Sequence, residues 1–247
     1  MHVQVRLFIL STQFLTRLPT PQVADFRPED LARSALWFPA VGLLIGVLVL
    51  AATWLGAHLD PWLGALFGLL AWVWVTGGLH LDGLADLADG LGAAHRDPTR
   101  LLAVMRDPHL GAFGVLALGL QLIFKLVLLM LIAREGLWLI LLLIPAWARL
   151  GPLLWTRQVP ALEAGLGERF AWSVSMRTLL LWGGALLIAS LGTPALLLAP
   201  LVLSAWTWFL LRRIGGMSGD MLGAGIELSE AALLLLASIL GSGFALT

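Results

Sequence analysis

The chain of 247 residues contains no cysteine and only one lysine, against fourteen arginines. The lack of cysteine excludes disulfides, zinc–thiolate sites, haem thiolates and iron–sulfur clusters, so any bound metal must use oxygen ligands or the five histidines. Charged residues are also scarce, at 12% of the chain, which is about half of the fraction in an ordinary soluble domain. The formal net charge is zero and gives nucleic-acid binding no electrostatic support.

Hydrophobic residues are abundant, at 60% of the chain, and the mean hydropathy is +0.93. We therefore predict an all-α integral membrane protein: one domain over residues 1–247, built as a polytopic helical bundle in the lipid bilayer. Seven transmembrane helices are expected. They cover residues 35–56, 61–79, 111–133, 137–154, 179–191, 194–211 and 231–244.

The first 33 residues are expected to lie outside the bundle, which would occupy residues 34–247. The apolar stretch at 7–15 is too short to span a bilayer and has no convincing signal-peptide cleavage site after it. We interpret it as an interfacial helix that ends before Pro19, followed by a polar linker and a short helix start near Pro28.

Basic residues are placed unevenly along the chain. Thirteen of the fifteen precede the first predicted span, follow the second, bracket the loop after the fourth (Arg149 included) or follow the sixth. The positive-inside rule then places the N-terminus and the three long loops in the cytoplasm, with the C-terminus outside.

The run TGGLHLDGLADLADG at 76–90 contains three of the nine aspartates. Asp82, Asp86 and Asp89 are spaced i, i+4 and i+7, so on a helix they share one face. Their mutual repulsion calls for a cation, and a divalent ion such as Mg²⁺ is the simplest candidate because it prefers carboxylate oxygens. The alternative is a polar helix end whose acids cap the next turn or face water.

Two further clusters are predicted on the same cytoplasmic face. In MRDPHLGAFG at 105–114, Asp107 is expected to cap a helix start, while Arg106 and the nearby Arg96 offer donors for phosphate. Lys125, further along the same predicted span, needs a buried partner or a route to the interface.

The second cluster is the glycine-rich segment at 215–225. Its backbone N–H groups, from Gly215 and Gly216 onward, could surround phosphate oxygens, and Asp220 could complete the coordination of a metal. A flexible loop without a ligand is the alternative, since the segment matches no P-loop pattern.

A metal held by carboxylates, with arginines and glycines nearby, indicates phosphoryl or phosphodiester transfer by a membrane enzyme. The segments TRLPT at 16–20, TGGLHLDGLADLADGLGA at 76–93, MRDPHLGAFG at 105–114 and GGMSGDMLGA at 215–224 resemble those of the cobalamin synthase family. In order and spacing this resemblance covers nearly the whole chain.

The resemblance implies a multi-pass enzyme of the bacterial inner membrane that makes cobalamin, with its active site on the cytoplasmic face. It would join adenosylcobinamide-GDP to α-ribazole or α-ribazole 5′-phosphate, release GMP and require Mg²⁺. Asp82, Asp86 and Asp89 would bind the metal, and one of them or Asp107 would take the proton from the attacking ribazole 5′-oxygen. The expected substrate-binding residues are Arg17, Arg96, Arg106, Gly215, Gly216, Ser218 and Asp220.

Two other functional classes stay open at this point. A divalent-cation transporter would need polar groups near the middle of several spans and interrupted helices in matching halves. A non-catalytic membrane scaffold would not need three aspartates on one face. The oligomeric state, including a homo-oligomer, is left open by the sequence.

Overall fold

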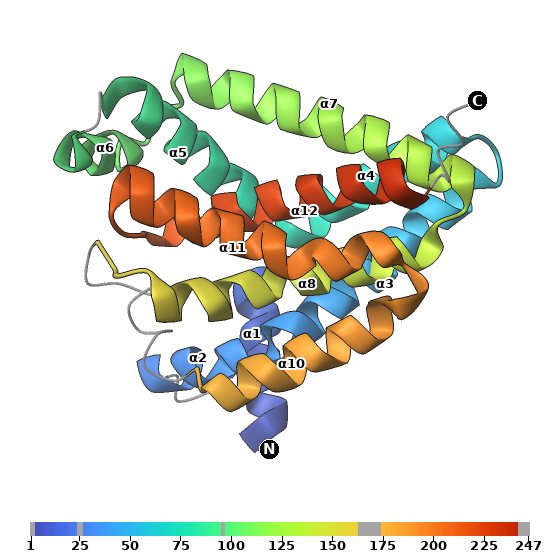
Figure 1. Ribbon diagram of the computed structural model, residues 1–247, viewed down its shortest axis with the longest axis horizontal. Coiled ribbons are helices and arrows are strands. Elements are labelled where there is room, and N and C mark those ends of the chain that lie inside the picture. The colour runs from blue at the N-terminus through green and yellow to red at the C-terminus, as the bar shows by residue number, and fades with distance from the viewer. Residues whose placement is uncertain (1–2, 24–26, 95–96, 163–173, 242–247) are drawn as a thin grey trace.

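The computed structural model describes residues 3–23, 27–94, 97–162 and 174–241. Within these ranges the chain forms helices and turns and contains no β-strand, as predicted (Figure 1). The α-helices are α1 (Val3–Leu15), α2 (Pro28–Ser34), α3 (Phe38–Ala57), α4 (Pro61–Thr76), α5 (Leu79–Ala94), α6 (Pro98–Met105), α7 (Ala112–Glu135), α8 (Trp138–Gln158), α10 (Met176–Ala189), α11 (Ala199–Phe209) and α12 (Gly219–Gly241). Shorter turns of helix are η1 (Ala35–Trp37), η2 (Ser190–Gly192), η3 (Pro194–Leu198) and η4 (Leu210–Ile214).

Five of the described helical stretches are long and apolar enough to cross a membrane: Glu29–Ala57, Ala112–Glu135, Trp138–Gln158, Pro194–Ile214 and Gly219–Gly241. The bent pair α4 and α5 would make a sixth span. The outer face of α7 exposes large apolar side chains, among them Leu116, Leu120 and Ile123. Such a surface suits lipid rather than water, so the chain is a multi-pass membrane protein.

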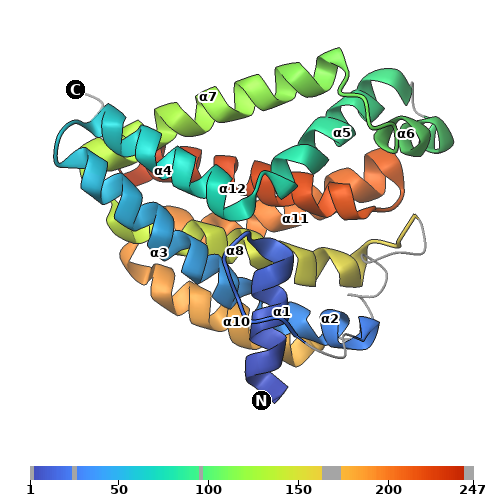
Figure 2. The ribbon, with the colours of Figure 1, turned by 180° about the vertical axis from the view of Figure 1, so that it is seen from behind.

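The helix α1 lies across the long helices, not along them (Figures 1 and 2). It has 13 residues, and one side of it, including Leu7 and Leu15, is buried against the bundle. Asp30 in the first turn of α2 forms an ion pair of 3.0 Å with Arg6 of α1. At 13 residues, α1 is shorter than the candidate spans among the described helices.

Glycine allows the closest helix contacts of the bundle. A Cβ on Gly42 or Gly46 of α3 would collide with backbone atoms of α8 near Ala146 and Leu142. These two glycines are four residues apart, which is the spacing that lets membrane helices approach closely. The helix α8 is the most buried of the candidate spans, with 83% of its most apolar stretch inside the structure, and α12 follows with 67%.

The break between α4 and α5 is a sharp bend of 86°. The helix α4 begins with Asp60, whose side chain accepts a hydrogen bond from the N–H of Trp62, and it ends at Gly77. Gly77 and Gly78 have φ values of 63° and 72°, which residues with a Cβ rarely adopt. The bend turns α5 away from the direction of α4 and ends the predicted span 61–79 at Thr76.

Three predicted boundaries or placements are wrong. The last long helix begins at Gly219 instead of residue 231, so most of the glycine-rich segment is helical and not a loop. The third span begins at Ala112, and Gly111, not Asp107, precedes it as the N-cap. Arg149 lies inside α8 and is fully buried, so it does not belong to a loop. The predicted break between the spans 179–191 and 194–211 is confirmed, because Thr193 separates η2 from η3.

Candidate functional site

The aspartate run forms the helix that its spacing predicts. Asp82, Asp86 and Asp89 all lie on α5, but their exposure differs: Asp82 is exposed, Asp86 is half-buried and Asp89 is buried. The three carboxylates therefore do not share one environment.

The carboxylate of Asp89 caps the start of α7. One of its carboxylate oxygens accepts a hydrogen bond of 2.8 Å from the N–H of Gly111, and the other accepts one of 2.9 Å from the N–H of Gly114. A helix N-terminus presents unpaired N–H groups and a partial positive charge, so a carboxylate from a neighbouring helix stabilises it. Asp89 thus performs the capping role that the sequence suggests for Asp107.

Asp220 joins the carboxylates of α5 from another helix. It lies in the first turn of α12, and a Cβ on Gly83 of α5 would collide with its backbone. Gly83 lies between Asp82 and Asp86, which are one helical turn apart on α5, so the start of α12 packs against the turn of α5 that carries both aspartates. The structure therefore brings together an acid cluster of Asp82, Asp86 and Asp220, with Asp89 at its edge.

The acid cluster suits a divalent cation that is shared with a phosphate ligand. Among the described residues, no three histidine, aspartate or glutamate side chains converge closely enough to hold a metal by themselves. Mg²⁺ is usually held by one or two carboxylates together with substrate phosphates, rather than by a complete protein cage. The chemistry of the donors, oxygen only and negatively charged, fits that arrangement.

Arg17 lies beside the bend between α4 and α5. Its backbone N–H donates a hydrogen bond of 2.7 Å to the carbonyl of Val75, and a Cβ on Gly77 would collide with its side chain. The side chain of Arg17 therefore passes over the α4–α5 bend and is exposed there. This places a guanidinium near the end of α5 that carries Asp82.

Arg106 and Asp107 lie in the turn between α6 and α7, near the end of α5 that carries Asp89. Asp107 accepts hydrogen bonds from the backbone N–H of His109, at 3.0 Å, and from its imidazole, at 2.6 Å. These two contacts lower the pKa of the Asp107 carboxyl below its usual value, the backbone contact having the larger effect. Asp107 is not part of the acid cluster. Arg96 lies outside the described residues.

The turn before α12 is tied to the segment after α8. Gly215 has a φ of 87° and its N–H donates to the carbonyl of Leu210, while the N–H of Met217 donates to the carbonyl of Pro160. Because these two amides already have backbone acceptors, Gly215 and Met217 do not contribute to the predicted ring of N–H groups. The side chain of Ser218 accepts a 3.4 Å hydrogen bond from the N–H of Met221 and so begins α12.

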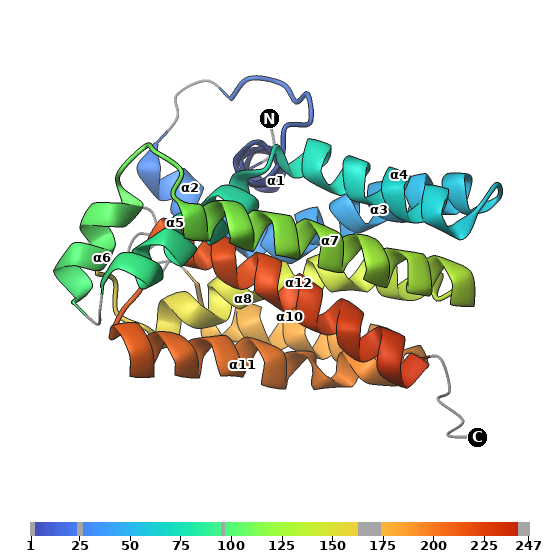
Figure 3. The same cartoon turned by 90° about the horizontal axis from the view of Figure 1, so that it is seen from above.

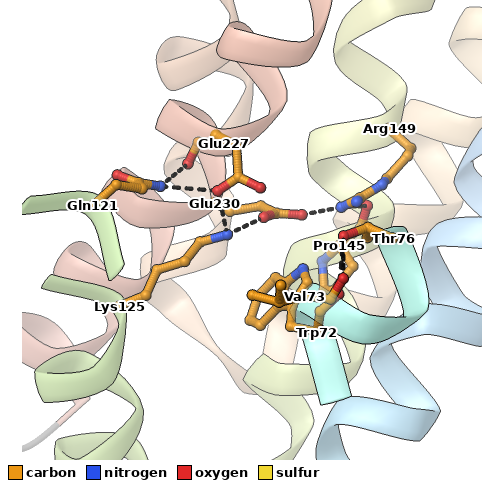
Figure 4. A network of polar contacts seen from close by, with 9 residues as sticks. All are labelled: Trp72, Val73, Thr76, Gln121, Lys125, Pro145, Arg149, Glu227 and Glu230. Carbon is orange, nitrogen blue, oxygen red and sulfur yellow. Dashed lines mark hydrogen bonds and ion pairs between the residues drawn. The ribbon is translucent and has the colours of Figure 1, made fainter. Parts of the chain in front are cut away.

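A second polar cluster lies inside the bundle (Figure 4). Lys125 of α7 forms ion pairs of 2.6 Å with Glu227 and 2.5 Å with Glu230, both on α12. Glu230 also pairs with Arg149 of α8. The predicted need of Lys125 for a partner is confirmed, but both glutamates escaped the sequence analysis. We call these four residues the buried ion network.

The two charged clusters differ in what they can do. In the buried ion network each acid faces a base, and all four side chains are almost completely buried. In the acid cluster, by contrast, carboxylates repel one another, and two of the three, Asp82 and Asp220, are exposed. The acid cluster is therefore the candidate catalytic site, and the buried ion network holds α7, α8 and α12 together.

Comparison with known proteins gives the family. The family model described as cobalamin-5-phosphate synthase matches residues 7–238. The chain belongs to the cobalamin-5-phosphate synthase family. The resemblance seen in the four sequence segments is therefore confirmed.

Relatives within this family are similar over almost their whole length. A protein of Laribacter hongkongensis named adenosylcobinamide-GDP ribazoletransferase is 59% identical over 239 residues, covering 95% of this chain and 97% of the relative. Proteins with the same name from Thiobacillus denitrificans and Pseudomonas aeruginosa PAO1 are 52% and 39% identical, and each alignment covers 95% of this chain and 96% or 98% of the relative. No solved structure matches this chain.

Proposed function

We propose that this protein is an adenosylcobinamide-GDP ribazoletransferase of cobalamin biosynthesis. The observation that carries the proposal is the acid cluster, in a chain whose family and relatives bear the name of this activity. The transporter alternative has no such support, since the relatives described above are named as transferases. The scaffold alternative leaves the repulsion within the acid cluster without a purpose.

The reaction exchanges one phosphate bond for another. A ribazole hydroxyl oxygen bonds to the phosphorus on the cobinamide side of the diphosphate, the bond from that phosphorus to the bridging oxygen breaks, and GMP leaves. Our expectation of attack by the 5′-oxygen does not suit a product that keeps a 5′-phosphate, as the family name implies. We therefore propose that a secondary hydroxyl of the ribose attacks.

Each part of the candidate site has a task in this scheme. Asp82, Asp86 and Asp220 would supply one or two of the oxygens that hold Mg²⁺ together with the diphosphate, and the ion would neutralise the diphosphate oxygens and stabilise the leaving phosphate. Arg17 binds phosphate from the side of the α4–α5 bend. Asp82, the exposed member, accepts the proton of the attacking hydroxyl. Asp89 positions α7 and is a positioning residue instead of a metal ligand.

The proposal also includes an orientation in the membrane. We propose seven crossings, with the shorter helix α10 as one of them, and a site that faces the cytoplasm of a bacterial inner membrane. Support comes from the arginines at the end where α6 and the turn before α12 lie, since Arg106, Arg212 and Arg213 are exposed there (Figures 1 and 3).

The test is release of GMP by the purified protein in nanodiscs, given adenosylcobinamide-GDP, α-ribazole 5′-phosphate and Mg²⁺. We expect Mg²⁺-dependent release that is lost in Asp82→Asn and in Asp86→Asn. Asp60→Asn is the matched control, because Asp60 caps α4 at the other end of the bundle. A wild-type protein that binds Mg²⁺ and both substrates but releases no GMP would refute the proposal.

A further inference from the structure

An apolar pocket of about 180 Å³ lies next to the acid cluster. Its walls include Phe14 of α1, Phe38 of α3, Pro152 of α8 and Ile226 of α12. The rings of Phe14 and Phe38 are stacked, with centroids 5.9 Å apart and planes 13° from parallel. The pocket is thus lined by flat and aliphatic groups that suit a flat apolar ligand.

Two of the described side chains that line this pocket carry polar atoms. One is Asp220, which also belongs to the acid cluster and so joins the pocket to the candidate site. The other is His80, which is 97% buried and whose Nε2 has no hydrogen-bond partner in the structure. An unpaired buried polar atom is costly, and a turn of the imidazole ring toward the pocket that it lines would let a ligand supply the partner.

From these observations we infer that the pocket binds the benzimidazole base of the ribazole substrate. The inference rests on the proposed function. A dimethylbenzimidazole attached to ribose is a flat apolar bicycle with one free ring nitrogen, which accepts a single hydrogen bond. The pocket supplies the matching parts: apolar walls and one imidazole N–H, from His80 in the tautomer with hydrogen on Nε2.

The other bulky parts of the two substrates do not match this pocket. Guanine carries several donors and acceptors on its ring edges, and most of them would be left unpaired against these walls. The corrin ring is too large, since pockets that enclose drug-sized ligands have volumes of about 300–1,000 Å³. With the base beside His80, the ribose extends toward Asp220, where its hydroxyl meets the acid cluster.

The test compares α-ribazole with its indole analogue, in which C–H replaces the free ring nitrogen. Equilibrium binding of both compounds to the protein in nanodiscs is measured for wild type, His80→Phe and His80→Gln. We expect wild type to prefer α-ribazole by about tenfold, as the loss of one buried hydrogen bond predicts. His80→Phe should bind both compounds equally, and His80→Gln, which keeps a donor, should restore part of the preference.

A pair of matched variants tests the location of the base. Ile226→Phe narrows the pocket and should raise the KM for α-ribazole 5′-phosphate while leaving the KM for adenosylcobinamide-GDP unchanged. Ala205→Phe, which narrows the separate groove between α5, α11 and α12, should change neither KM.

Two results would overturn the inference: an unchanged preference for α-ribazole in His80→Phe, or a selective rise of the KM for adenosylcobinamide-GDP in Ile226→Phe. Both results require a wild-type protein that releases GMP. Failure of the proposed function would appear instead as a wild-type protein without GMP release, so the two failures are distinguishable.

Discussion

The carboxylate of Asp89 on α5 lies 2.8 Å from the backbone nitrogen of Gly111, just before α7 begins. Its other oxygen binds the N–H of Gly114. Asp89→Ala would leave both N–H groups without this acceptor, so we expect a loss of about 1–3 kcal/mol in the free energy of unfolding. Denaturant unfolding in mixed micelles measures this loss. Asp82→Ala is the control, and its free energy of unfolding should stay within about 0.5 kcal/mol of the wild-type value, since Asp82 is exposed. Equal losses in both variants would contradict the capping role.

Asp220 is expected to affect metal affinity. Removal of one charged ligand oxygen in Asp220→Asn should raise the Mg²⁺ concentration for half-maximal GMP release roughly 10–100-fold, as for the loss of a contact to a charged group. A titration of GMP release with Mg²⁺ measures the shift. Asp97→Asn, which changes an exposed cap of α6, should leave the titration unchanged. An Asp220→Asn protein with wild-type Mg²⁺ dependence would remove Asp220 from the metal site.

Lys125 forms ion pairs with Glu227 and Glu230, and of these two glutamates Glu230 also pairs with Arg149. In Lys125→Met the negative charges of Glu227 and Glu230 stay buried, and we expect a loss of about 3–5 kcal/mol in stability. Adding Glu227→Gln removes one of those charges and should recover part of the loss. The control on the same helix is Arg134→Met, because Arg134 is exposed. If Lys125→Met and Arg134→Met lower the free energy of unfolding by equal amounts, the buried ion network does not stabilise the bundle.

The absence of cysteine makes the proposed orientation simple to measure. Single cysteines can replace Arg134, in the last turn of α7, and Arg212, in η4 just before α12, both exposed in the structure. The end of α7 and the start of α12 lie at opposite ends of the bundle (Figure 1). A membrane-impermeant maleimide applied to intact spheroplasts should label Arg134→Cys, and it should label Arg212→Cys only after the membrane is permeabilised. The reverse pattern would invert the proposed orientation.

The pH dependence of Asp107 follows from its contacts with His109. Both contacts favour the charged carboxylate, so its pKa lies below the ordinary 3.8. Their contribution to stability is therefore present above the ordinary pKa and is lost as the pH falls through the lowered one. His109→Ala removes the imidazole contact and should raise the pKa of Asp107, which ¹³C NMR of the carboxyl group can follow. An unchanged pKa would show that the ring makes no contribution.

The sequence was sufficient for features that depend on local spacing. The 3.6-residue period of Asp82 and Asp86 predicted helix α5, and proline and glycine predicted the turn near Thr193. The start of α12 could not be predicted in this way, because glycine usually disfavours helices. Glycine occupies positions 223 and 225 of this helix because they face His80 and Trp206, where a Cβ would be crowded.

Features that depend on distant partners escaped prediction. Asp89 caps a helix whose N-cap residue, Gly111, lies 22 residues further along the chain, whereas the sequence suggested Asp107 as a local cap. The partners of Lys125 are more than 100 residues away, and a hydropathy pattern does not show which buried charges meet. Arg149 was placed in a loop for the same reason: its partner Glu230 lies on a helix 81 positions later.

The central position of α12 has a consequence for how the protein is made. This helix contacts α5, α7, α8 and α11, all of which precede it in the chain. During synthesis those four helices leave the ribosome first, so Lys125 and Arg149 meet Glu227 and Glu230 only after α12 has followed. The pairs of the buried ion network are therefore the last to form along the growing chain.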